Sequence, residues 1–146
     1  MIRALIDTNV LASGIAGYRK GWGAPYDVIR RWRENEYELL TSPHVLDELA
    51  TTLVNQWFSQ YLTEPERQAA VKVIRSVGTV VEPNPDLVRG VATHWEDDRV
   101  LAAAVAGEAD YLVTGDRKLR ALQSFAEVRI LSVHEFLAVL DMAAGE

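Results

Sequence analysis

The chain of 146 residues contains no cysteine. This absence excludes disulfide bonds, thiolate metal ligands and thiol nucleophiles, and it is typical of a reducing compartment. Histidine is scarce, and His44, His94 and His134 do not have the spacing of a zinc site. No hydrophobic run approaches the roughly 20 residues of a membrane helix, and we recognise no secretory leader. We therefore expect a cytoplasmic location.

Basic residues are outnumbered by acidic ones. Lys and Arg total 15 whereas Asp and Glu total 21, which gives a net charge of −6. Proteins that bind nucleic-acid backbones by electrostatic attraction alone are usually basic, so this balance argues against nonspecific coating of nucleic acid. It does not exclude a nucleic-acid substrate, because bound metal ions can reverse the charge of an acidic site.

Short apolar runs alternate with longer helical patterns. Buried strands are predicted at 3–7 and 109–114, with weaker candidates at 37–41, 78–83 and 128–132. Helices are predicted at 24–34, 43–56, 63–76, 97–107 and 133–143, and turn-rich segments at 14–23 and 83–85. This alternation predicts one α/β domain over residues 1–146. Right-handed crossovers would build a central parallel sheet of four or five strands with helices on both faces.

Two aspartates follow the two clearest strands. Asp7 comes directly after the apolar residues 3–6, and Asp116 comes shortly after 111–114. In an open parallel sheet, ligands bind beyond the carboxyl ends of the strands. We therefore expect both carboxylates at the same rim of the sheet.

Further acids lie on predicted helices. In the helix at 43–56, Glu48 lies on the flank of the apolar stripe while Asp47 points nearly opposite, so Glu48 is the one able to reach inward. Asp97 and Asp98 both stand at the start of an apolar helix, and periodicity does not choose between them.

Each acid alone also fits a structural role, as a helix cap or a solvated charge. Together, however, carboxylates gathered at one rim would repel and raise one another's pKa unless a cation were bound. Hard divalent ions with oxygen ligands meet that need, and Mg²⁺ or Mn²⁺ is the expected choice.

Four segments carry a family resemblance. DTNVL at 7–11, SPHVLDEL at 42–49, DDRVLAAAVAGEADYLVTGD at 97–116 and VRILSVHEFL at 128–137 together resemble the PIN domain. The similarity is strongest to bacterial and archaeal toxin components related to VapC. It implies a three-layer α/β/α sandwich and a metal-dependent endoribonuclease that uses one or two Mg²⁺ or Mn²⁺ ions.

The resemblance also assigns residues. It implies that catalysis and metal binding rest on four acids, with Asp97 as an accessory acid, and that three polar residues support those carboxylates. The four acids are Asp7, Glu48, Asp98 and Asp116, and the supporting residues are Asn9, Ser42 and Thr114. Thr8 matches the family as well, without a clear role.

Basic residues near the predicted rim are candidates for contact with RNA. Arg19, Lys20, Arg117 and Lys118 are expected on loops or helix starts near the rim, where they could contact phosphates. Tyr18 or Trp22 could stack on a base. The alternative is that these are solvated basic positions. Of the histidines, only His94 is expected near the site, and we expect a structural role for all three.

The resemblance implies partners as well. An RNA substrate, a possible antitoxin protein and a homodimer are expected. Two other functions stay open: a catalytically silent PIN scaffold that binds RNA or protein, and an aspartate-based phosphotransfer enzyme. The second is disfavoured because haloacid-dehalogenase phosphatases have an aspartate where this chain has Asn9.

Overall fold

A six-stranded sheet forms the centre of the molecule. The computed structural model describes residues 1–91 and 95–145. The strands lie in the order β3-β2-β1-β4-β6-β5, and all neighbours pair in parallel except β5 and β6. Their bounds are β1 Arg3–Ile6, β2 Glu38–Thr41, β3 Thr79–Val80, β4 Tyr111–Val113, β5 Ser124–Phe125 and β6 Val128–Leu131. The predicted parallel sheet is confirmed, and β5 adds a short antiparallel edge strand.

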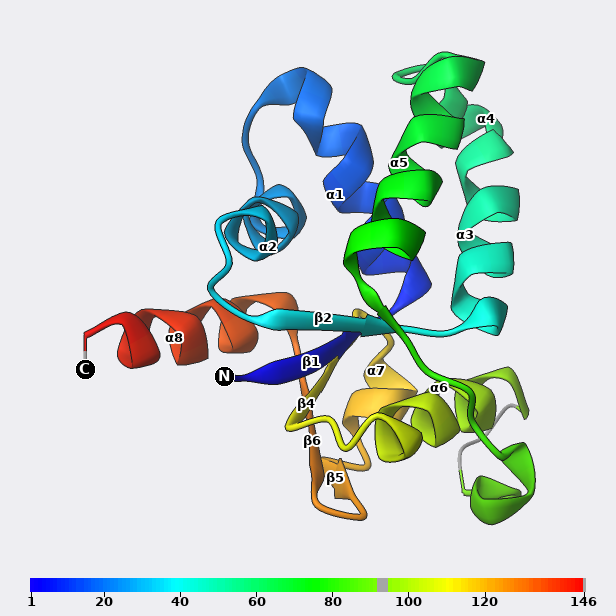
Figure 1. Cartoon of the computed structure of the whole chain (residues 1–146), viewed down its shortest axis with the longest axis vertical. Helices are drawn as coiled ribbons and strands as arrows, with labels where there is room; N and C mark the ends of the chain where they lie inside the picture. The colour runs from blue at the N-terminus through cyan, green and yellow to red at the C-terminus, as the bar shows by residue number, and fades with distance from the viewer. Residues whose placement is uncertain (92–94, 146) are drawn as a thin grey trace.

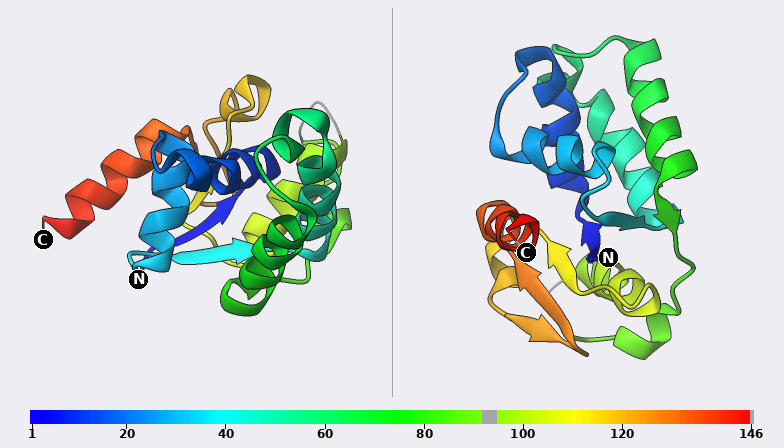
Figure 2. Two further views of the ribbon diagram at one scale, coloured as in Figure 1. Left: turned by 90° about the horizontal axis from the view of Figure 1, so that it is seen from above. Right: turned by 60° about the vertical axis from the view of Figure 1, so that its left-hand side comes forward.

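Helices cover both faces of this sheet (Figure 1). Helices α1, α2, α3 and α5 lie on one side, and α6 lies on the other. Helix α8 packs against α2, β4 and β6, and the right-hand view of Figure 2 shows it nearly end-on. The helices are α1 Thr8–Lys20, α2 Ala24–Arg33, α3 Pro43–Val54, α4 Gln56–Ser59, α5 Glu64–Val77, α6 Trp95–Ala106, α7 Arg117–Arg120 and α8 Val133–Ala144, with a 3₁₀ turn at Pro85–Val88.

The crossovers change faces at the boundary between β1 and β4. The chain passes from β1 to β2 over the face with α1 and α2, and it passes from β3 to β4 over the opposite face with α6. Where crossovers diverge in this way, open α/β sheets have their ligand-binding crevice beyond the carboxyl ends of the strands, here those of β1 and β4. Asp7 and Asp116 follow these two strands.

Burial patterns explain the elements nearest this crevice. Ala4, Leu5 and Ile6 are fully buried, as expected for a parallel strand covered on both faces. The apolar stripe predicted for the helix at 43–56 is confirmed in α3, where Val45, Leu46, Leu49 and Leu53 are buried. Ser42 caps α3 by accepting a hydrogen bond from the Val45 amide, and a capping box of Thr63 and Glu66 begins α5.

The turn predicted at 14–23 is wrong over most of its length. Helix α1 continues to Lys20, and within residues 14–23 only Gly21 and Gly23 have positive φ, at 76° and 121°. Gly14 and Gly17 instead allow α2 to approach α1. A Cβ on Gly14 would lie 2.5 Å from Ile29 Cδ1, and one on Gly17 would lie 2.9 Å from the Tyr26 Cβ. These glycines serve helix packing and form no turn.

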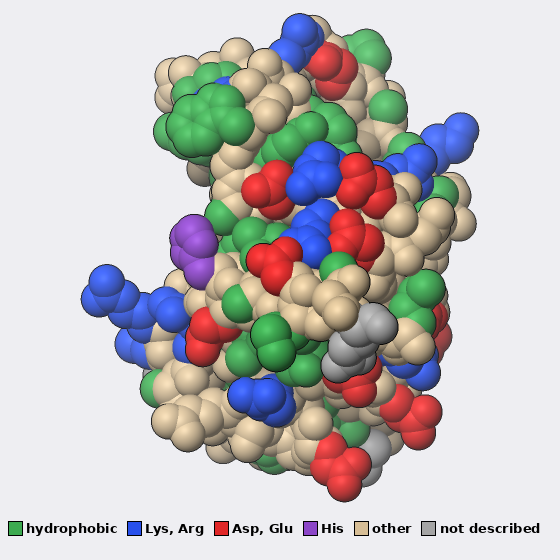
Figure 3. Space-filling model, turned by 90° about the vertical axis from the view of Figure 1, so that its left-hand side faces the viewer, with side chains coloured by type: hydrophobic (Ala, Val, Ile, Leu, Met, Phe, Trp, Pro, Cys, Tyr) green, Lys and Arg blue, Asp and Glu red, His purple; other side chains and the backbone are tan. Residues whose placement is uncertain are grey.

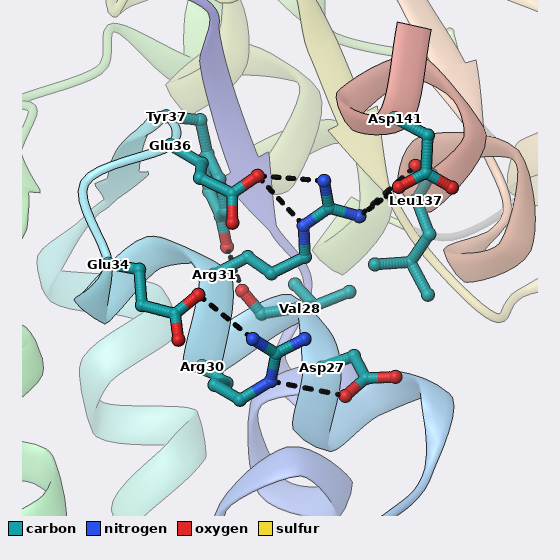
Figure 4. Close-up of polar contacts among 9 residues, drawn as sticks. All are labelled: Asp27, Val28, Arg30, Arg31, Glu34, Glu36, Tyr37, Leu137 and Asp141. Atoms are coloured by element: carbon teal, nitrogen blue, oxygen red, sulfur yellow. Dashed lines mark hydrogen bonds and ion pairs between the residues drawn. The ribbon is translucent and has the colours of Figure 1, made fainter. Parts of the chain in front are cut away.

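Ion pairs join α2 to α8. Acidic and basic side chains lie side by side on the face of the molecule shown in Figure 3. Figure 4 shows Arg31, whose side chain is only 11% exposed, between two carboxylates. Its guanidinium donates to Glu36 at 2.7 and 3.0 Å and to Asp141 at 2.7 Å. The C-terminal helix is therefore held to α2 by a largely buried cation.

Within residues 1–91 and 95–145, no helix is both long and apolar enough to cross a membrane.

Candidate functional site

Asp7 is held by both strands that border the crevice. Its amide donates to the Val113 carbonyl at 2.9 Å, which extends the β1–β4 pairing by one residue. Its Oδ1 accepts from the Thr8 amide at 2.8 Å, and its Oδ2 accepts from the Thr114 hydroxyl at 2.7 Å. Burial raises the pKa of Asp7 above its ordinary value, although these hydrogen bonds oppose the rise.

Thr114 links Asp7 to Asp116. The Thr114 side chain is fully buried. Its hydroxyl donates to Asp7 and accepts from the Asp116 amide at 3.1 Å. Asp116 caps α7, because its Oδ1 accepts from the amides of Lys118 and Leu119 at 2.8 and 3.2 Å. The charge of Asp116 also contributes to the raised pKa of Asp7. The two aspartates therefore share one rim, and both are helix caps as well.

Glu48 faces the same crevice from α3. Burial raises its pKa, and the charges of Asp7, Glu96 and Asp97 add to the rise. Its Oε2 and the Oγ1 of Thr8 are buried and poorly aligned for hydrogen bonding, although the Thr8 side chain partly offsets the rise in the Glu48 pKa. Raised carboxylate pKa values and poorly aligned buried oxygens are what an acidic site shows in the absence of a compensating cation. This hard oxygen donor set fits a divalent ion.

Asp98 is placed differently from the other acids. It is 7% exposed, and its Oδ2 accepts from the Gly90 amide at 2.9 Å. The principal charges that raise the pKa of Glu48 include that of Asp97 and not that of Asp98. Among the residues that the structure describes, no three His, Asp or Glu side chains converge in a metal-binding geometry. Asp7 nonetheless lies close enough to Asp116 and to Glu48 for their charges to interact, and the charges of Asp97 and Glu96 act on Glu48.

One histidine contacts Glu48. His44 Nε2 lies 3.0 Å from Glu48 Oε2, and Arg99 Nη1 lies 3.3 Å from His44 Nδ1. The expectation that only His94 lies near the site was therefore wrong, and His94 itself is outside the described residues. The i, i+4 spacing of His44 and Glu48 on one predicted helix was the available signal.

A sequence model of the PIN domain matches residues 3–118, which is most of the chain. The chain belongs to the PIN-domain family. It matches no curated protein by sequence.

Solved structures share the PIN-domain fold of this chain. One is the PAE2754 protein of Pyrobaculum aerophilum, with 20% identity, a TM-score of 0.63 and coverage of 97% of this chain and 98% of that one. VapBC2 of Rickettsia felis, solved bound to a promoter DNA fragment, has 17% identity, a TM-score of 0.61 and coverage of 90% and 98%. VapC20 of Mycobacterium tuberculosis, a toxin that cleaves the sarcin-ricin loop, has 24% identity, a TM-score of 0.56 and coverage of 86% and 98%.

The structure places two of the residues that were predicted to support the carboxylates. Ser42 is fully buried, and its Oγ accepts from the Val45 amide at 3.2 Å, so it caps α3. Asn9 lies in the first turn of α1 and is exposed. Ser42 therefore acts on the start of the helix that carries Glu48. The contribution of Asn9 stays a prediction.

The basic candidates divide into two groups. Arg117 and Lys118 are exposed at the start of α7, directly after Asp116. Arg19 and Lys20 lie at the far end of α1, roughly 20 Å from its start at Asp7, since a helix rises about 1.5 Å per residue. Their predicted place near the rim was wrong, because residues 14–20 are helical.

Arg19 and Lys20 also have contacts of their own at that far end. The Arg19 guanidinium donates to Glu66 at 2.8 Å. The Lys20 ammonium lies 5.0 Å from the Tyr61 ring centroid and 5.9 Å from that of Trp57. These contacts pack α1 against α4 and α5. Nearby, Trp22 is 70% exposed.

Proposed function

We propose that this PIN domain is a metal-dependent endoribonuclease that hydrolyses RNA phosphodiester bonds. The observation that supports the proposal is the placement of Asp7 and Asp116 after β1 and β4, where Thr114 bonds to both residues and the charge of Asp7 acts on Glu48. Family membership supports it, since the matched region contains all of these acids. One domain over residues 1–146 would contain the whole site.

The acids would hold one or two Mg²⁺ or Mn²⁺ ions. Such an ion, when bound, supplies a Lewis acid for the phosphate and a water of lowered pKa. The proposed ligands are Asp7, Glu48, Asp98 and Asp116, with Asp97 as an accessory acid. Thr114 would keep Asp7 and Asp116 in register, because its hydroxyl bonds to both residues.

Substrate binding is proposed for the start of α7. Arg117 and Lys118 are exposed next to Asp116, and their charges suit the phosphates that flank a scissile bond. The net charge of −6 leaves little general attraction for RNA, so these two cations would contribute through position.

We further propose that the protein is the toxin of a toxin–antitoxin pair and acts in the cytoplasm. The fold is shared with VapC20 and with the VapBC2 complex. A VapB-like antitoxin and a second copy of the chain are the proposed protein partners. Co-expression with a neighbouring small open reading frame, followed by purification, tests this point: a stable complex supports it, and independent elution contradicts it.

Cleavage of single-stranded RNA with Mn²⁺, and with EDTA in its place, tests the nuclease. Asp7→Asn and Glu48→Gln should each abolish Mn²⁺-dependent cleavage. Asp47→Asn is the matched control, because Asp47 precedes Glu48 on α3 and is exposed; it should cleave like the wild type. Retention of full activity by both site variants would refute the proposal. A silent scaffold would show neither cleavage nor Mn²⁺ binding.

A second pair of variants chooses between the acids of α6. Asp98→Asn keeps an oxygen for the Gly90 amide, which bonds to Asp98 at 2.9 Å. If Asp98 binds the ion, this variant loses activity while Asp97→Asn loses less. The reverse order would assign the ligand to Asp97.

A further inference from the structure

His44 and Glu48 form a pair on one side of α3. They are four residues apart, so their side chains are neighbours on the helix surface. The His44 Nε2 lies 3.0 Å from the Glu48 Oε2, a contact distance. This oxygen is buried. The imidazole edge therefore lies against the carboxylate.

Arg99 determines which nitrogen of His44 carries the proton. Its Nη1 lies 3.3 Å from the His44 Nδ1. A guanidinium has only donors, so Nδ1 must present its lone pair to Arg99. In a neutral imidazole the proton is then on Nε2, the atom that faces Glu48.

Glu48 needs a group that keeps it in the crevice. Its side chain is 38% exposed and has three rotatable bonds. The charges of Asp7, Glu96 and Asp97 all repel it. The Thr8 side chain supplies one opposing contact, and without a second one the carboxylate would rotate toward solvent and away from Asp7.

We infer that His44 is a positioning residue for Glu48: Arg99 holds the imidazole in its Nε2–H form, and that N–H holds the carboxylate toward Asp7. The inference rests on the proposed function, in which Glu48 binds a divalent ion. A neutral N–H suits this task, because a Lys or Arg at position 44 would compete with the ion for the carboxylate charge. Arg99 follows Asp98 on α6, so the chain of contacts also ties α6 to α3.

Binding of Mn²⁺ to the full chain, measured by isothermal titration calorimetry, tests the inference. His44→Leu should weaken Mn²⁺ binding about 10-fold, the lower end of the effect of residues that orient metal ligands. His44→Gln should recover most of that loss, since its amide N–H can occupy the place of Nε2–H. His134→Leu is the matched control and should bind like the wild type, because His134 is exposed in the first turn of α8.

Nitrogen-15 NMR of the histidine rings gives a second readout, without metal and without a variant at position 44. The wild-type ring should show the proton on Nε2, and Arg99→Met should give a mixture of tautomers. A proton on Nδ1 in the wild type, or wild-type Mn²⁺ affinity in His44→Leu, would overturn the inference. If His44→Leu does not fold, the position of the ring proton in the wild-type protein decides whether the inference holds. Undiminished Mn²⁺ binding by Asp7→Asn would instead refute the proposed function.

Discussion

Thr114 offers the sharpest test of how the site is assembled. Its buried hydroxyl donates to Asp7 at 2.7 Å and accepts from the Asp116 amide at 3.1 Å. Thr114→Val removes that hydroxyl and keeps the shape of the side chain. Thr114→Ser keeps the hydroxyl and removes one buried methyl group. The pair therefore separates the two hydrogen bonds from the packing.

The hydroxyl should matter more than the methyl group. A hydrogen bond to a charged group contributes about 1.5–3 kcal/mol, and an amide left unsatisfied costs about 1–3 kcal/mol. Because the Asp116 amide is only partly buried, we expect Thr114→Val to lose about 2–4 kcal/mol of unfolding free energy. Loss of one buried methyl group costs about 1 kcal/mol. Thr114→Ser should therefore remain closer to the wild type.

Urea unfolding of the metal-free proteins, followed by circular dichroism from pH 3 to pH 8, measures this difference. The hydroxyl favours the ionised form of Asp7, so the gap between the two variants should be largest at neutral pH. It should narrow as the pH falls through the raised pKa of Asp7. Equal stability of the two variants at pH 7, or a gap independent of pH, would refute the proposed role of this hydroxyl.

Four further perturbations test other parts of the structure. Because burial raises the pKa of Asp7, its ionisation destabilises the fold as pH rises; Asp7→Asn, which can still cap α1, should raise the metal-free melting temperature at pH 7 but not at pH 3. Gly14→Ala should lose about 1–3 kcal/mol of unfolding free energy through overpacking, despite a gain of about 1 kcal/mol in helix propensity. A variant more stable than the wild type in urea unfolding would contradict the close packing of α1 and α2. Arg31→Met should lose about 2 kcal/mol of unfolding free energy. Asp141→Asn should lose less than about 1 kcal/mol, because the Asp141 side chain is 72% exposed. Equal losses in thermal melts would contradict the role of the largely buried Arg31 in holding α8 to α2. The Thr63 amide, the Arg19 guanidinium and the Thr63 hydroxyl lower the pKa of Glu66 to about 2, so Glu66→Gln should lower the urea midpoint at pH 7, less at pH 3, and least at pH 2.

Local patterns predicted most of the elements that position the site. The apolar run before Asp7 and the stripe of α3 depend on neighbouring residues, and both were confirmed. Helix α1 was missed because Gly14 is typical of a turn in isolation, yet here it lies under Ile29 of α2. That error also placed Lys20 at the rim, about 20 Å from where the helix carries it.

The sequence by itself determined the alternation of strands and helices and the position of Asp7 and Asp116 shortly after strands, because these follow from residues close together in the chain. Only the tertiary structure decided that Thr114 bridges the two aspartates, that Asp98 turns to Gly90, and that Arg99 meets His44. The Arg99–His44 contact joins residues 55 positions apart. Periodicity describes one element at a time, and such contacts depend on how separate elements pack.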